Sequence, residues 1–123
     1  MSRILLVDDE ADVRRALATF LRGMGHDVRT AANGVEAIAA LRDSADLLIT
    51  DINMPDMDGI EMVTTLREAA STMPIIAMSG GGLFDKGMLL DAAEALGADL
   101  TLEKPFDLEV LRAAVEKLIA TAS

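Results

Sequence analysis

Short apolar runs alternate with helix-like stretches five times along this 123-residue chain, and this alternation constrains the fold more than any other feature. The apolar runs, which we predict to be strands, cover residues 4–7, 28–31, 47–50, 74–78 and 99–103. Each is followed by apolar residues at three- and four-residue spacing, which is typical of an amphipathic helix. Strict alternation predicts an α/β sandwich whose five parallel strands are joined by right-handed crossovers.

The helical stretches have recognisable faces and ends. In the first, the apolar positions are Val13, Leu17, Phe20, Leu21 and Met24, and the glycines at 23 and 25 predict the stop. Asn33-Gly34 predicts a turn into a short helix that ends near Arg42, with its apolar face at Val35, Ile38 and Leu41. Further helices are expected after Gly59, from about Asp85 to Leu96, and across Leu108, Leu111, Val115, Leu118 and Ile119.

Composition and charge exclude several classes of protein. The chain is 51% hydrophobic and 26% charged, with no linker or repeat, so residues 1–123 are predicted to form one folded domain. The formal net charge of −10 disfavours direct binding of nucleic acids and of anionic membranes. Cysteine is absent and the first apolar run is too short for a signal peptide or membrane span, so a cytoplasmic location is expected.

Polar side chains follow four of the five strand candidates. Asp8 and Asp9 come after the first, Asp51 after the third, Ser79 after the fourth and Lys104 after the fifth. In an open parallel sheet the ligand site lies outside the carboxyl ends of the strands, so these five side chains are expected to converge.

The chemistry of this set favours phosphoryl transfer with a hard cation. Carboxylates gathered in one cleft repel each other unless a cation neutralises them, and Mg²⁺ prefers such oxygen ligands. Asp51 could then act as a nucleophile, while Lys104 and the metal stabilise charge on the transferring phosphoryl oxygens. Taken one at a time, Asp8 could be a helix cap, Ser79 a loop hydroxyl and Lys104 a surface lysine, but their shared position at one edge favours a site.

The chain resembles the receiver domains of response regulators over nearly its whole length. The resemblance is carried by Ile4-Leu5-Leu6-Val7-Asp8-Asp9-Glu10, by Asp51-Ile52-Asn53-Met54-Pro55-Asp56-Met57-Asp58-Gly59, by Ser79 and by Lys104-Pro105-Phe106. It implies a flavodoxin-like fold, phosphorylation of Asp51 and Mg²⁺ held by Asp9, Asp51 and the Asn53 carbonyl, with Asp8 acting largely through water. It also implies that Ser79 and Lys104 bind phosphoryl oxygens and that the bond before Pro105 is cis.

Three features depart from the family pattern. Thr101 stands where the family commonly has an aromatic residue, Gly80 stands where alanine is common, and the segment from Ser79 to Lys104 is a few residues longer than usual. The hydroxyl-to-aromatic switch therefore lacks its second half. We expect the glycine-rich segment 80–87 to transmit phosphorylation instead, by exposing or covering Leu83 and Phe84.

The resemblance implies a stand-alone signalling module that takes its phosphoryl group from a histidine kinase or histidine phosphotransfer protein. It would act on an unidentified downstream protein as a monomer or weak dimer, with no catalysis beyond its own phosphorylation and dephosphorylation. One alternative is a pseudo-receiver that binds its partner constitutively, which the complete acid set disfavours. Another is an aspartyl-phosphate hydrolase, whose second acid is missing because Asn53 stands two residues after Asp51.

Overall fold

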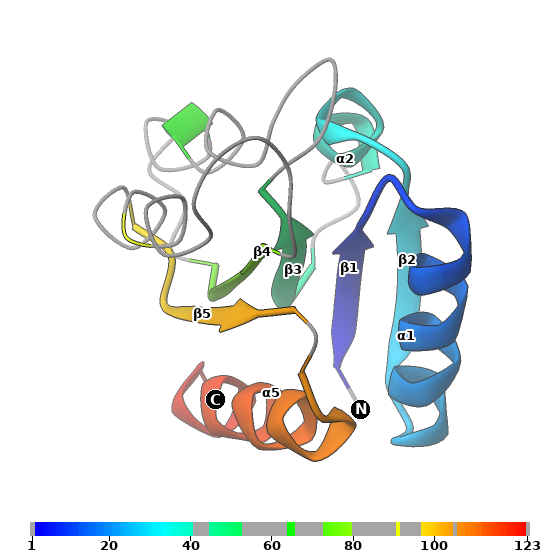
Figure 1. The fold of residues 1–123 in the computed structure, drawn as a ribbon. Helices are drawn as coiled ribbons and strands as arrows, with labels where there is room; N and C mark the ends of the chain where they lie inside the picture. The colour runs from blue at the N-terminus through cyan, green and yellow to red at the C-terminus, as the bar shows by residue number, and fades with distance from the viewer. Residues whose placement is uncertain are drawn as a thin grey trace.

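The structure is a computed structural model that describes residues 2–40, 45–52, 64–65, 73–79, 91, 97–104 and 106–122. Its elements are β1 (Arg3–Val7), α1 (Ala11–Gly23), β2 (Asp27–Ala31), α2 (Gly34–Ala40), β3 (Leu47–Asp51), β4 (Ile75–Ser79), β5 (Leu100–Glu103) and α5 (Leu108–Ala122). All adjacent strands are parallel, in the order β2-β1-β3-β4-β5 (Figure 1). This order defines the flavodoxin-like doubly wound fold, so the predicted fold class is confirmed.

Apolar side chains cover both faces of the sheet. Every residue of β3 and β4 is buried, because each strand lies between two other strands and apolar side chains pack on both of its faces. Alternate residues of β1 enter two separate core clusters, Leu5 on the side of α2 and Leu6 on the side of α1 and α5. Figure 1 shows α2 and α5 on opposite sides of the sheet. The sheet is therefore covered on both faces, as the predicted α/β sandwich requires.

The predicted apolar face of α2 was partly wrong. Val35 is 60% exposed, whereas Gly34 and Ala37 are buried and Ile38 packs against the core. Because successive helical residues are rotated by about 100°, a helix that turns Gly34 toward the sheet must turn Val35 away. Leu108, one of the apolar residues that marked the last helix, is 43% exposed, since it is the first residue of α5.

The predicted turn at Asn33 is the start of α2. The Glu36 backbone N–H donates to Asn33 Oδ1 at 2.9 Å, and Glu36 Oε1 accepts from the Ala32 N–H at 3.2 Å. This reciprocal pattern closely resembles a capping box, and it satisfies backbone donors that a helix start leaves unpaired. The spacing of an asparagine and a glutamate three residues later was the signal for it in the sequence.

Two aspartates tie neighbouring strands together at the amino-terminal edge of the sheet. Asp46 Oδ2 accepts from the Arg3 N–H at 2.8 Å, and the Asp46 N–H donates to the Arg3 carbonyl at 2.7 Å. Asp99 makes the same pair of bonds with Ile75, at 2.8 and 2.9 Å. Each aspartate follows an alanine and precedes the leucine that begins a strand, so the sequence repeats with the geometry.

Replacing Asp99 with alanine should lower the free energy of unfolding by about 1–2 kcal/mol, because the N–H of fully buried Ile75 loses a charged acceptor. Asp46→Ala should lower the free energy of unfolding by less, since Arg3 is exposed and water can replace the lost acceptor. Urea unfolding of both variants would test this. A larger loss in Asp46→Ala would contradict the burial argument.

Candidate functional site

Four of the predicted site residues lie at the carboxyl ends of the strands. Asp8 follows β1, Asp51 ends β3, Ser79 ends β4 and Lys104 follows β5. Asp8 and Ser79 are fully buried and Asp51 is 4% exposed, which is unusual for polar side chains. Their position confirms the expectation that strand ends bring distant parts of the chain together.

Lys104 joins two of these carboxylates. Its Nζ donates to Asp8 Oδ2 at 2.6 Å and to Asp51 Oδ2 at 3.1 Å, across 96 and 53 residues of sequence. The Lys104 backbone N–H donates to the Ser79 carbonyl at 2.8 Å, which fixes the chain where it leaves β5. Two acids and one ammonium group thus form a hydrogen-bonded cluster, and only 14% of the Lys104 side chain is exposed.

The environment raises the pKa of Lys104 above its ordinary value of 10.5. Burial alone lowers this pKa, but the hydrogen bond to Asp8 and the negative charge of Asp51 raise it and outweigh burial. Lys104 is therefore a fixed positive charge at neutral pH. It can attract an anionic group without exchanging a proton.

The β1–α1 loop holds Asp8 rigidly and presents two further acids. The Glu10 N–H donates to Asp8 Oδ1 at 2.9 Å, and Arg14 Nη1 donates to the Asp8 carbonyl at 2.7 Å. Asp9 and Glu10 are exposed, and one carboxylate oxygen from each of Asp8, Asp9 and Glu10 can lie within 4.8 Å of the others. This donor set consists of hard oxygens and fits a divalent cation such as Mg²⁺. Neither the anchoring role of Arg14 nor Glu10 as a potential ligand was predicted.

The Ser79 hydroxyl has unused hydrogen-bonding capacity. Its Oγ is buried and has no hydrogen-bond partner among the residues that the structure describes. A buried polar group without a partner costs free energy, and such groups in native proteins commonly have a functional explanation. Ser79 is one position beyond Met78, which is paired in register with Asp51, so Ser79 and Asp51 lie at the same edge of the sheet on adjacent strands.

Several predictions fall on residues outside the described ranges. These are the Asn53 carbonyl ligand, the switch segment 80–87 with Leu83 and Phe84, the cis bond before Pro105, and most of the helices expected after Gly59 and from Asp85. Thr101 is described: it is half-buried and lies opposite Ala77 in the β4–β5 register.

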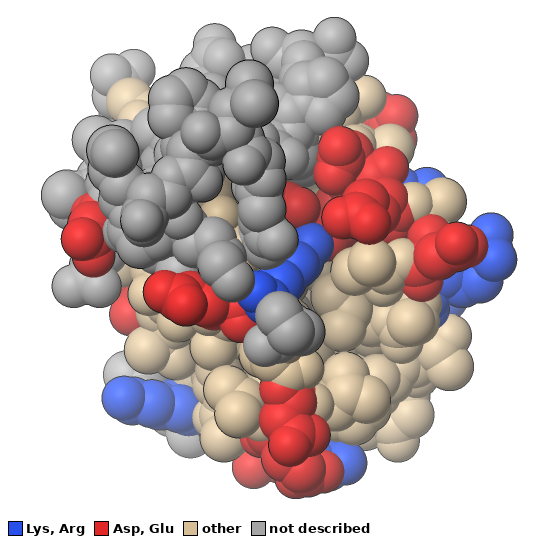
Figure 2. All heavy atoms as spheres, in the orientation of Figure 1, with Lys and Arg blue, Asp and Glu red and all other residues tan. Residues whose placement is uncertain are grey.

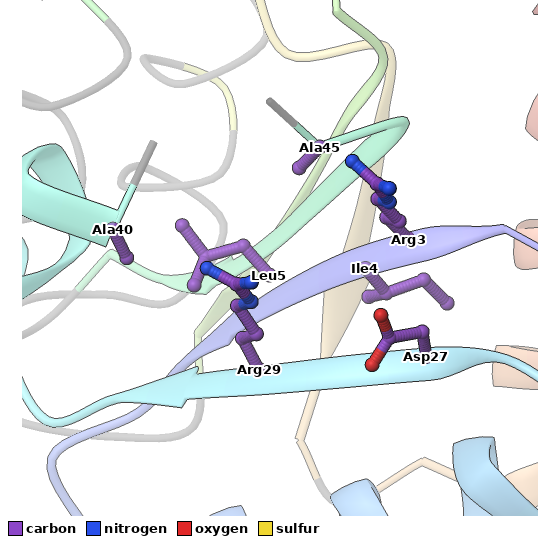
Figure 3. A pocket seen from close by; sticks show the side chains of 7 residues that line it. All are labelled: Arg3, Ile4, Leu5, Asp27, Arg29, Ala40 and Ala45. Carbon is purple, nitrogen blue, oxygen red and sulfur yellow. The ribbon is translucent and has the colours of Figure 1, made fainter. Parts of the chain in front are cut away.

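Among the charged side chains on the face in Figure 2, the acidic ones cover more area than the basic ones, in keeping with the net charge of −10. A hollow of about 10 Å³ lies away from the acidic cluster, between the start of the β1–β2 pair and residues Ala40 and Ala45 (Figure 3). The side chains of Arg3 and Arg29 line this hollow. This volume is at the lower limit for one water molecule, so the hollow is too small for a substrate.

In the described part of the chain, no helix is both long and apolar enough to cross a membrane.

The comparisons with known proteins agree on one family. The family model for the response regulator receiver domain matches residues 4–116. The chain is 35% identical, over 97% of its length, to a transcriptional regulatory protein, the CpxR homolog of Haemophilus influenzae, and it spans about half (51%) of that protein. It is 36% identical, over 89% of its length, to 11% of the sensor histidine kinase RcsC of Salmonella typhimurium.

A solved structure extends this similarity to a protein of equal size. The putative response regulator from Chloroflexus aurantiacus is 33% identical to this chain and superimposes with a TM-score of 0.87. The match covers 97% of this chain and 98% of that one. Receiver domains generally bind Mg²⁺ in an acidic pocket, and the chain has an acidic cluster of Asp8, Asp9 and Glu10 directly after β1.

Proposed function

The chain belongs to the response regulator receiver family, and on that premise we propose that Asp51 is the residue that accepts the phosphoryl group. The observation that carries this assignment is the hydrogen bonding of buried Asp51 to Lys104, which also binds Asp8. Residues 1–123 would act as one receiver domain. The complete acid set gives no support to the constitutive pseudo-receiver.

Each residue of the cluster has a distinct role in this proposal. A carboxylate oxygen of Asp51 attacks phosphorus, the phosphorus–nitrogen bond of a phosphohistidine donor breaks, and the electron pair returns to the imidazole. Lys104 then directs its ammonium group to a phosphoryl oxygen, exchanging one anionic partner for another. The Ser79 hydroxyl donates to a second phosphoryl oxygen, which gives this buried donor its partner.

Mg²⁺ would be held by Asp9, Asp51 and the Asn53 carbonyl, with Asp8 contributing largely through water. When bound, the ion neutralises the acidic cluster and stabilises negative charge on the phosphoryl oxygens. The Glu10 N–H holds the side chain of Asp8 and Arg14 holds its backbone carbonyl, so this part of the site requires little rearrangement.

The partners follow from this chemistry. A histidine kinase or histidine phosphotransfer protein would supply the phosphoryl group in the cytoplasm, and a downstream protein would respond to the phosphorylated form. The charge of −10 argues against direct contact between this domain and nucleic acid, although some longer relatives are named transcriptional regulators. Catalysis would be limited to self-phosphorylation and self-dephosphorylation.

Intact mass after treatment with phosphoramidate tests the function, because this donor contains the same kind of phosphorus–nitrogen bond. With Mg²⁺ the protein should gain a single phosphoryl group, and with excess chelator it should gain far less. Equal modification with and without Mg²⁺, or no modification at all, would argue against a Mg²⁺-assisted receiver.

Mg²⁺ should stabilise the folded protein, since the ion binds the native acidic cluster and not the unfolded chain. At ten times Kd the gain is about 1.4 kcal/mol. Asp51→Asn should unfold at a higher temperature than the parent protein without metal, because one buried charge is removed, and it should gain less from Mg²⁺. Thermal melting across a Mg²⁺ titration would show both effects, and overlapping melting curves for the parent protein would contradict a metal site.

A further inference from the structure

A groove with arginine walls runs between α1 and β2, which is an edge strand of the sheet. It has a volume of about 210 Å³ and is lined by Ala11, Arg14, Arg15, Ala18, Arg22 and Thr30. Residues 11, 15, 18 and 22 follow the three- and four-residue spacing that places side chains on one side of a helix. The small alanines leave the space open, and the long arginines border it.

Two of the arginines are held in place without losing their charge. Arg14 Nη1 donates to the Asp8 carbonyl at 2.7 Å, and Arg22 Nη2 donates to the Val28 carbonyl at 2.8 Å. A carbonyl orients a guanidinium group but does not neutralise it. In the part of the chain that the structure describes, neither arginine forms an ion pair with a carboxylate.

The charge of the third arginine, Arg15, is only weakly neutralised by a neighbouring acid. Arg15 lies 3.9 Å from the carboxylate of Asp12, and these side chains are 78% and 100% exposed. Such exposed pairs contribute little and readily exchange partners. Three positive charges therefore border one groove in a chain whose acids outnumber its bases by 21 to 11.

We propose that this groove binds an extended acidic peptide segment of a partner protein. The guanidinium groups of Arg14 and Arg22 each have five N–H donors and use one of them on the carbonyl of Asp8 or Val28, so donors remain for carboxylates. Arg14 and Arg22 are eight residues apart, about 12 Å along the helix axis. Two acids four positions apart in an extended peptide lie on one face and span about 13 Å, which matches this separation.

A polyanion or a single small anion fits the groove less well. The exposed acids Asp9, Glu10 and Asp12 lie next to Arg14 in sequence, and with the net charge of −10 they repel a continuous phosphate backbone. One phosphate ion is too short to engage both fixed arginines. Arg14 also holds the carbonyl of Asp8, which belongs to the phosphoryl cluster, so the substitution that tests the groove is made at Arg22, which is bonded to the Val28 carbonyl instead.

Titration of the isotope-labelled protein with a short peptide tests the proposal, followed by backbone amide chemical shifts. The peptide carries two glutamates four positions apart, and the reference peptide carries glutamines instead. The glutamate peptide should shift amides of α1 and β2. Arg22→Gln should weaken its binding by about tenfold, and Arg22→Lys, which keeps the charge, by clearly less.

Arg112→Gln is the matched control because it removes the same charge from a different place. Arg112 is paired with Glu109 at 3.3 Å and lies over the Phe20 ring, so its loss should leave peptide binding unchanged. Equal weakening by Arg112→Gln and Arg22→Gln would overturn the proposal, as would equal binding of both peptides or no binding. Tighter binding of an oligonucleotide or of inorganic phosphate at the same amides would also overturn it. Asp51→Asn should bind the peptide normally, which separates this result from any failure of the phosphorylation proposal.

Discussion

Replacing Lys104 with methionine should lower the free energy of unfolding by about 3 kcal/mol at neutral pH without divalent metal. Methionine keeps the length and the apolar stem but removes the ammonium group, which leaves the buried carboxylates of Asp8 and Asp51 without their shared cation. Lys117→Met is the control, because Lys117 is an exposed lysine of α5. Urea unfolding should show a small change in the control and a large one in Lys104→Met.

The cause of the lower stability of Lys104→Met can be identified from how it depends on pH and on Mg²⁺. Because the pKa of Lys104 is raised in the folded protein, its stabilising effect is complete below the ordinary value of 10.5 and is lost as pH rises through the higher folded value. The difference in the free energy of unfolding between the parent protein and Lys104→Met should therefore become smaller at strongly alkaline pH. Saturating Mg²⁺ should also restore part of the stability of Lys104→Met. A loss of stability that is independent of both pH and Mg²⁺ would indicate a packing defect instead.

Asp51→Asn should eliminate phosphorylation by phosphoramidate, at least a hundredfold below the parent protein, because an amide oxygen cannot replace the carboxylate nucleophile. The side chain keeps nearly the same shape, so the fold should be unchanged. Asp12→Asn removes the same charge from a fully exposed position and should be phosphorylated at the parent rate. The rates can be followed by intact mass.

The outcome that contradicts this prediction is a phosphorylated Asp51→Asn protein, which would show that another side chain accepts the group. Equal slowing by Asp12→Asn would instead show that overall charge, and not the nucleophile, controls the rate.

The strands and the site were largely predictable because their signals are local. The apolar runs marked every strand within one residue at each end, and the polar residues after them marked the carboxyl edge of the sheet. Burial on both faces could also be predicted, since β1, β3 and β4 carry few polar side chains.

What could not be predicted depends on contacts between distant parts of the chain. The pairing of Lys104 with both Asp8 and Asp51 requires the strand order, which residue spacing does not specify. The exposed side of Val35 was missed because a short helix has several possible apolar faces, and the sheet selects the one with the smallest residues. The arginine groove was missed because Arg14, Arg15 and Arg22 have the pattern of an ordinary solvated helix face.

The central claim, that Asp51 carries the phosphoryl group, is tested most directly by chemical mapping of the modified residue. Borohydride reduction of the protein after phosphoramidate treatment converts an aspartyl phosphate to homoserine, and peptide mass spectrometry locates the change. Conversion at position 51, dependent on Mg²⁺ and absent from untreated protein, is the expected result. Conversion at Asp8, Asp9 or any other aspartate, with position 51 unchanged, would contradict the assignment.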